Sequence, residues 1–186
     1  DGLTVAGNVS VDGGTIKLSG NHPTGSNNVA LGDESFQNIS TGNNNTAVGR
    51  ASLFANTSGG ANTAIGSSAL EANTTASNNT AVGKSALEAN TTGTDNTSVG
   101  YRAGASITTG AYNTAIGRTA LEDATTSSSN TAVGYRALWV NSTGTRNVAV
   151  GRQAADANTN TVSQQKKETN GKSVTVKDLI PVFEKL

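Results

Sequence analysis

The sequence contains no cysteine and no methionine, and only 4% of its 186 residues are aromatic. Without cysteine the chain can form no disulfide, thiolate metal site or catalytic thiol, so the redox compartment does not follow from the sequence. Average domains contain more large apolar side chains than this one. The composition therefore argues against an ordinary globular core.

Charge of either sign is also scarce, since 13 Lys and Arg balance 13 Asp and Glu. The longest basic run is Lys166-Lys167, which leaves no electrostatic footprint for nucleic acid or an anionic membrane. No apolar stretch approaches the length of a membrane span. We therefore expect neither nucleic-acid binding nor membrane insertion. Because the chain starts at Asp1 without an initiator Met or a secretory signal, we expect a processed chain or a fragment.

What the sequence does contain is a 17-residue repeat. Glycines recur at this spacing from Gly32 to Gly151 without insertion or deletion, which a disordered Asn-rich and Thr-rich segment has no reason to do. Asn stands four residues before each of these motif glycines and an aliphatic residue directly before it, so the unit reads NTAVG; only Ser98 departs from its Ala. In the six central copies these structural residues are Asn45, Val48, Gly49, Asn62, Ile65, Gly66, Asn79, Val82, Gly83, Asn96, Val99, Gly100, Asn113, Ile116, Gly117, Asn130, Val133 and Gly134.

The segment TAV is short, β-branched at both ends and bounded by Asn and Gly, which predicts a strand of about three to five residues. Period-two alternation places Thr46 and Val48 on one face and Asn45 and Ala47 on the other. Coils of equal length stack such strands in register, about 4.8 Å apart. We therefore predict a mainly β repeat solenoid of eight coils with a length of roughly 34 Å.

A second segment follows each glycine, as in SSALEAN at 67–73. It is compatible with a second strand or with one turn of helix. We favour the turn of helix, because Ala, Leu and Glu are good helix formers, Ser68 suits the start and Asn73 a left-handed end. Glycine recurs ten residues after several motif glycines, as at Gly59, where we expect a positive φ.

One chain has little to bury. Each coil offers one Val or Ile and usually one Leu against the conformational entropy of ordering 17 residues. Alanine faces packed around a shared axis would supply further burial. We therefore expect a homotrimer, intertwined or side by side, with the Ala ladder buried between subunits.

The repeat divides the chain into three parts. Residues 1–27 alternate apolar and polar residues around GN and DGG and predict a β-rich collar or shaft. The repeat solenoid covers 28–158. Residues 159–186 predict a polar linker and a terminal element, in which Val174 suits a strand and Pro181 the start of a helix.

The motifs NTAVG, NTAIG and NVAVG, each followed by xxAL and an NTTG-like turn, resemble repeats of fibres and related virion appendages of tailed bacteriophages, including cyanophages. The resemblance covers 28–158. A more distant resemblance is to the head of trimeric autotransporter adhesins, through VALG at 29–32. Both imply homotrimers that bind surfaces. We therefore expect a rigid spacer in a virion, with other virion or fibre proteins at its ends and host glycan or protein as possible contacts; the alternative is an adhesin on a bacterial cell surface.

Candidate catalytic groups are few. Glu71 and Glu88 occupy the same place in adjacent coils, and stacking would bring their backbones about 4.8 Å apart, near the carboxyl spacing of a retaining glycosidase. The next coil has Ala105 there, so we expect a solvated charged ladder. His22 has no second His or Cys to complete a metal site. We expect no catalytic residue, no cofactor and no metal, hence no enzyme.

Long side chains gather at one corner of the coil. The residue directly after the motif glycine is Arg50, Lys84, Tyr101, Arg118, Tyr135 or Arg152 in six coils. Tyr101, Tyr135 and Trp139 are the candidate surface contacts, through stacking and hydrogen bonds to glycan or protein. The alternative is that such side chains cover seams between coils or pair with carboxylates across subunits.

A regular Thr column, from Thr46 to Thr131, also suits the lattice of ice. We expect the Val on the same face to point inward, which argues against this use. Ice binding stays a remote alternative.

Overall fold

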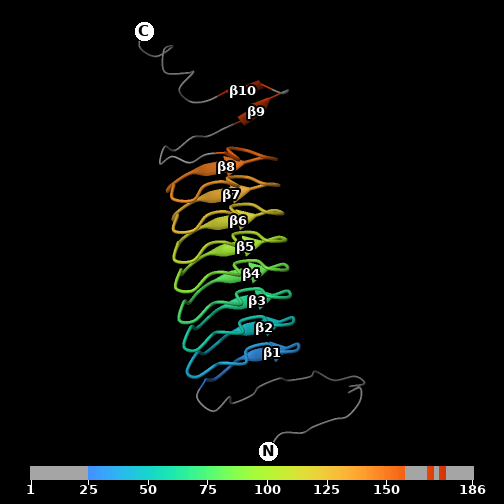
Figure 1. Cartoon of the computed structure of the whole chain (residues 1–186), viewed down its shortest axis with the longest axis vertical. Helices are drawn as coiled ribbons and strands as arrows, with labels where there is room; N and C mark the ends of the chain where they lie inside the picture. The colour runs from blue at the N-terminus through green and yellow to red at the C-terminus, as the bar shows by residue number, and fades with distance from the viewer. Residues whose placement is uncertain (1–24, 158–166, 170–171, 175–186) are drawn as a thin grey trace, which may run out of the picture.

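The computed structural model describes residues 25–157, 167–169 and 172–174. Its main element is one parallel sheet in which strands β1 to β8 follow each other in sequence order (Figure 1). These strands are β1 (Val29–Leu31), β2 (Thr46–Val48), β3 (Thr63–Ile65), β4 (Thr80–Val82), β5 (Thr97–Val99), β6 (Thr114–Ile116), β7 (Thr131–Val133) and β8 (Val148–Val150). About seven complete turns connect β1 to β8, so the predicted mainly β solenoid is confirmed.

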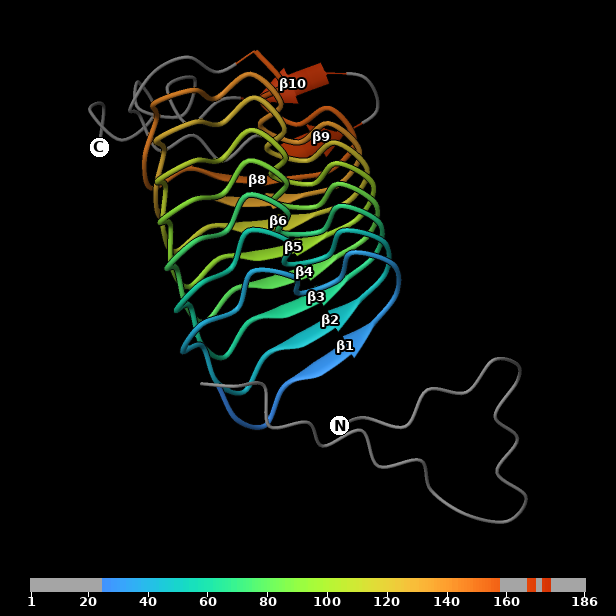
Figure 2. The ribbon, with the colours of Figure 1, turned by 60° about the horizontal axis from the view of Figure 1, so that its bottom comes forward.

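The strands pair in the register that equal coil length dictates. Thr46 pairs with Thr63, and Val48 with Ile65, and the same offset of one coil holds from β1 to β8. Figure 2 shows each coil leaving the sheet, turning back and re-entering it one strand further on. Like residues therefore form columns along the stack.

Small side chains fill the interior of each coil. Ala47 in β2 and Asn45 just before it are fully buried on the inward side. Ala69 and Leu70 reach the interior of the stack from the segment that follows each motif glycine, such as 67–73, which we call the return segment. The expected burial of the Ala ladder between subunits is therefore wrong, because the ladder lies within the chain's own coils. Alanine suits this place because strand and return segment lie too close together for larger side chains in both walls.

The outward side of the sheet carries Thr and the aliphatic residues. The predicted alternation is confirmed, but the expectation that Val points inward is wrong: Ile65 is 41% exposed and Val150 is 60% exposed. Alternation fixes only that Ala and Val lie on opposite sides. The narrow interior selects the smaller of the two.

Asparagine ties neighbouring coils together from inside. The backbone N–H of Asn79 donates to Oδ1 of Asn62 in the preceding coil (3.0 Å). The Nδ2 group of Asn79 donates to the carbonyl oxygen of Gly93 (2.9 Å). Both asparagines are fully buried, so each amide satisfies backbone groups that water cannot reach.

The return segment is neither a helix nor a strand, which corrects the predicted turn of helix. Ser68 and Leu70 adopt left-handed φ values of 57° and 52°. The N–H of Leu70 donates to the carbonyl of Ala86 in the next coil (3.0 Å), so hydrogen bonds run between coils instead of along a helix. Asn73, expected to be left-handed, is buried without a positive φ. Stacking overrides the local helix propensity.

The motif glycines have a backbone that other residues rarely adopt. Gly66 has φ of 135°, and a Cβ atom there would lie 2.5 Å from the carbonyl oxygen of Gly83. By contrast, the expected positive φ at Gly59 is wrong. The positive φ occurs instead at the repeat position two residues later, which Asn78 (φ 62°) occupies in the following coil.

A second sheet contains β9 (Lys167–Thr169) and β10 (Lys172–Val174), which pair antiparallel. This hairpin lies in the segment predicted as linker and terminal element. The predicted collar up to residue 24 and Pro181 lie outside the described residues. Within the described ranges, no helix has the length and apolarity to cross a membrane.

Candidate functional site

The outward side of β2 to β7 forms an uncharged surface, which we call the Thr/aliphatic face. Two columns run along it. They consist of Thr46, Thr63, Thr80, Thr97, Thr114 and Thr131, and of Val48, Ile65, Val82, Val99, Ile116 and Val133. The Thr residues are half-buried, because neighbours along the column cover part of each.

The aliphatic column of this face is open to solvent in the single chain. Val99 and Ile116 are 36% and 40% exposed, and the column continues into Leu31 of β1 and Val150 of β8. Single exposed aliphatic residues are common, but a continuous apolar stripe marks a contact surface.

A second column follows the motif glycines. We call Lys84, Tyr101, Arg118, Tyr135 and Arg152 the Tyr–Arg column. The Cζ atom of Arg118 lies 5.7 Å from the ring centroids of both Tyr101 and Tyr135. Arg152 lies 5.6 Å from the ring of Tyr135. The structure thus brings together two of the three predicted contact residues and places a cation between them.

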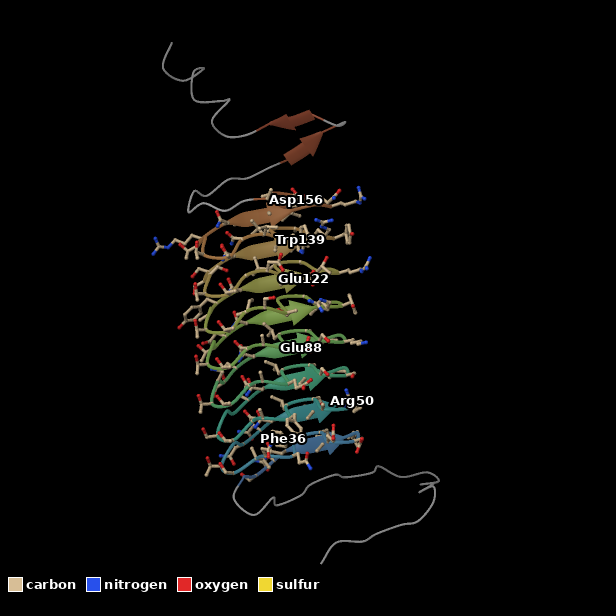
Figure 3. The ribbon with its side chains drawn as sticks, viewed as in Figure 1. Phe36, Arg50, Glu88, Glu122, Trp139 and Asp156 are labelled. Atoms are coloured by element: carbon tan, nitrogen blue, oxygen red, sulfur yellow. The ribbon has the colours of Figure 1, made fainter. Side chains whose placement is uncertain are left out.

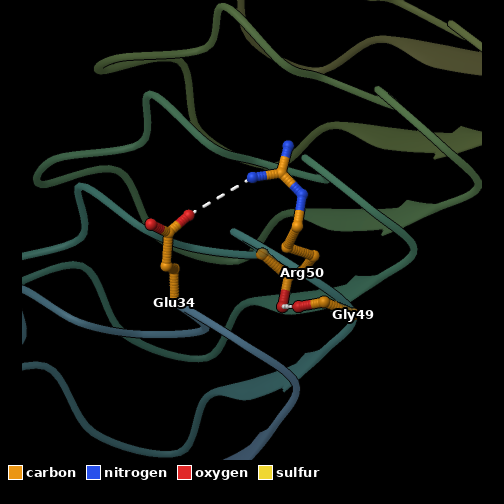
Figure 4. Close-up of polar contacts among 4 residues, drawn as sticks. Glu34, Gly49 and Arg50 are labelled. Atoms are coloured by element: carbon orange, nitrogen blue, oxygen red, sulfur yellow. Dashed lines mark hydrogen bonds and ion pairs between the residues drawn. The ribbon is translucent and has the colours of Figure 1, made fainter.

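Arg50 occupies the same repeat position but has a carboxylate partner. Its Nη1 atom lies 3.3 Å from Oε2 of Glu34 in the preceding coil (Figure 4). Both side chains are about half exposed, so the pair adds little stability. It does, however, neutralise the first cation of this corner.

Trp139 lies apart from the Tyr–Arg column, in a cluster of its own. The guanidinium of Arg136 stacks on its ring, 3.5 Å from the centroid, and its Nε1 donates to Oε2 of Glu122 (3.2 Å). Glu122 also accepts a hydrogen bond from Nε of Arg102, which raises the pKa of that guanidinium above its ordinary value. Figure 3 shows Glu122 and Trp139 on neighbouring coils.

Sequence reasoning missed this cluster. Arg102 and Glu122 are 20 residues apart, one coil plus three residues. A signal was present in the sequence. Arg102 is the second residue after its motif glycine, Glu122 is the fifth residue after the motif glycine of the next coil, and their charges are opposite.

Glu71 and Glu88 lie in adjacent layers, because the N–H of Ala72 donates to the carbonyl of Glu88 (3.0 Å), and Ala105 ends the run. Among the described residues, no group of three or more His, Cys, Asp or Glu could hold a metal ion. His22 lies outside the described residues. That the chain is not an enzyme stays a prediction.

Comparisons with known proteins add no family to these observations. No family model, curated protein or solved structure matches the chain. The resemblance to fibre and adhesin repeats therefore stays a prediction, and the function must be argued from the surfaces themselves.

Proposed function

We propose that this chain is a stiff structural segment of a fibre in a phage virion and that it assembles as a homotrimer through the Thr/aliphatic face. The observation that carries the proposal is the solvent-exposed aliphatic column, represented by Ile65, Val99 and Ile116. A parallel stack in register with hydrogen bonds between all neighbouring strands gives the stiffness that a spacer needs.

A second copy of the chain is the partner that best fits this face. The face repeats once per coil, and another copy has the same repeat, so the aliphatic rows of two chains can interlock along their full length. No charged residue stands in either column to oppose close contact. Three such faces meet around one axis in a trimer, which places the interface on the Val and Ile side instead of the Ala ladder predicted from the sequence.

Sedimentation equilibrium of the purified chain tests the assembly. We expect a species of three times the 18.6 kDa chain mass. Replacing Ile65 with Arg should give monomers, because three guanidinium groups would meet in an apolar interface without partners. Thr75→Arg, at an exposed position of the return segment, should leave the trimer intact. A monodisperse 18.6 kDa species for the unaltered chain would contradict the proposal.

The cellular setting needs a separate measurement. Mass spectrometry of purified virions should find the chain at a stoichiometry of three per appendage or a multiple of it. Recovery in the surface fraction of a bacterium, and not in virions, would favour the alternative adhesin. Neither result depends on the assembly test.

One observation also favours ice binding as a second candidate function. The Thr column lies on the outward side of the parallel sheet, in register from coil to coil, so the expectation that argued against this use does not hold. A buried face cannot meet ice, and the two functions therefore exclude each other on this surface. Thermal hysteresis at millimolar protein separates them, and no activity at that concentration ends the ice-binding idea.

A further inference from the structure

Cations recur at the glycine corner in every second coil. Arg50, Lys84, Arg118 and Arg152 each follow a motif glycine directly, and each is two coils from the next. With neighbouring strands about 4.8 Å apart, successive cations leave the backbone about 9.6 Å apart. In Figure 3 Arg50 lies on the right-hand side of the stack, where further nitrogen-tipped side chains project from the coils above it.

Tyrosine rings contact two of these cations, Arg118 and Arg152. Tyr101 stands between Lys84 and Arg118, and Tyr135 between Arg118 and Arg152. The cation–π contacts measure 5.6–5.7 Å from Cζ to the ring centroid. A ring on each side limits the rotamers of Arg118, so less entropy is lost when a ligand binds.

The cations of the Tyr–Arg column have no acidic partner within the part of the chain that the structure describes. The two ion pairs there join Arg50 to Glu34 and Arg102 to Glu122. Lys84, Arg118 and Arg152 are exposed, and Tyr101 is 43% exposed. The column is thus a line of ordered, unpaired positive charge alternating with phenol groups.

We propose that the Tyr–Arg column binds a linear acidic polysaccharide that bears one carboxylate per disaccharide. The planar fork of Arg118 and Arg152 matches a carboxylate, and the tyrosine hydroxyls can hydrogen-bond to sugar hydroxyls. The distance between successive cations is about the length of a disaccharide in an extended chain. Successive carboxylates of the polysaccharide can therefore each lie beside one cation of the column. This inference goes beyond the proposed spacer function, because it adds a binding surface and names its ligand class.

Charge density favours a polysaccharide over nucleic acid. One nucleic-acid strand presents a phosphate about every 3.4 Å, roughly three times as often as the column presents a cation. The chain as a whole has no net charge to offset the remaining phosphates. A ligand with sparse, regularly spaced carboxylates matches the column better.

Isothermal titration of the full chain with hyaluronan oligosaccharides, which carry one carboxylate per disaccharide, tests the inference. We expect binding at low salt that weakens as salt rises. Neutral dextran should not bind. Replacing Arg118 and Arg152 together with Gln should weaken binding at least tenfold. Arg146→Gln, an exposed cation on another part of the coil, should leave binding unchanged.

A gain of binding provides a second test. Glu34→Gln releases Arg50 from its ion pair and so adds a fourth cation at the same two-coil spacing. The affinity for hyaluronan should therefore rise several-fold. Unaltered affinity in the double variant, equal binding of dextran, or binding of dextran sulfate without hyaluronan would each overturn the inference. The column lies within one chain, so the two proposals can fail separately. A monomer that binds hyaluronan contradicts the trimer and supports polysaccharide binding. A trimer that does not bind hyaluronan supports the trimer and contradicts polysaccharide binding.

Discussion

The Cδ1 atom of Ile107 lies 3.0 Å from the place that a Cβ atom at Gly104 would occupy. In most coils the position of Gly104 holds Leu and that of Ile107 holds Asn or a small residue. Ile107 therefore fills the interior that Leu fills elsewhere. The exchange leaves Oδ1 of Asn90, in the preceding coil, without a hydrogen-bond partner among the described residues. A large side chain can thus enter the interior from either position, and in the first coil Phe36 and Ile39 do so from both.

The same coil contains a buried hydroxyl that we expect to weaken the stack. Oγ of Ser98 is buried without a partner in the described structure, where the other central coils have Ala. Ser98→Ala should raise the free energy of unfolding by about 1–2 kcal/mol, measured by urea denaturation followed through Trp139 fluorescence. Ser52→Ala is the control: its Oγ donates to the carbonyl of Gly49 (2.9 Å), so its loss should be neutral or destabilising. Equal effects would contradict this account.

Two motif glycines separate backbone strain from steric overlap. Gly151→Ala should destabilise by about 1–3 kcal/mol, because φ is 132°, although among the described residues only Cβ of Ala154 lies near, at 3.8 Å. Gly66→Ala has the same strain and also brings Cβ to 2.5 Å from the carbonyl oxygen of Gly83. We expect a clearly lower thermal midpoint for the Gly66 variant. Similar midpoints would mean that φ alone selects glycine here.

The buried asparagines should matter far more than their exposed neighbours. Asn79→Ala removes the acceptor of the buried Asn96 N–H (2.9 Å) and leaves that group unpaired, whereas the carbonyl of Gly93 keeps a second donor, Nδ2 of Asn90 (3.0 Å). We expect a loss of about 1–3 kcal/mol and faster hydrogen exchange at the Asn96 amide. Asn78→Ser is the matched control, since Ser129 already occupies its repeat position with φ of 60°. An Asn96 amide that stays protected would rule out this role.

Left-handed residues at the exposed corner offer a way to stabilise the chain. Tyr112 has φ of 59° and is 65% exposed, so its side chain contributes little packing. Tyr112→Gly should relieve strain and raise stability by about 1 kcal/mol. Thr109→Gly, at an exposed site without positive φ, should lower stability by about 0.5–1 kcal/mol. Thermal denaturation of both variants checks the opposite signs.

The repeat spacing predicts those features of the fold that depend only on equal coil length. A constant interval between Gly32 and Gly151 fixes the register of every strand pair, and alternation within TAV fixes which residues share a side. Both predictions are confirmed because they need no knowledge of the rest of the coil.

What the sequence did not predict depends on contacts with other parts of the stack, either the opposite wall or the next coil. Alternation could not tell whether Ala47 or Val48 faces inward, because the width of the interior is set by the opposite wall. Local propensity favoured a helix at Ser68 to Asn73, but the N–H of Leu70 finds its acceptor in the next coil. The Thr/aliphatic face was misplaced for the first reason, and the cluster around Trp139 was missed for the second.

Each strand in the stack pairs only with the strands directly before and after it. If a whole 17-residue unit is removed or duplicated, equivalent repeat positions of the new neighbours pair again and the remaining layers keep their structure. Near-identical tandem segments in the gene are natural substrates for unequal crossing-over, so the length of this rod can evolve in steps of one layer, about 4.8 Å, without any new folding problem.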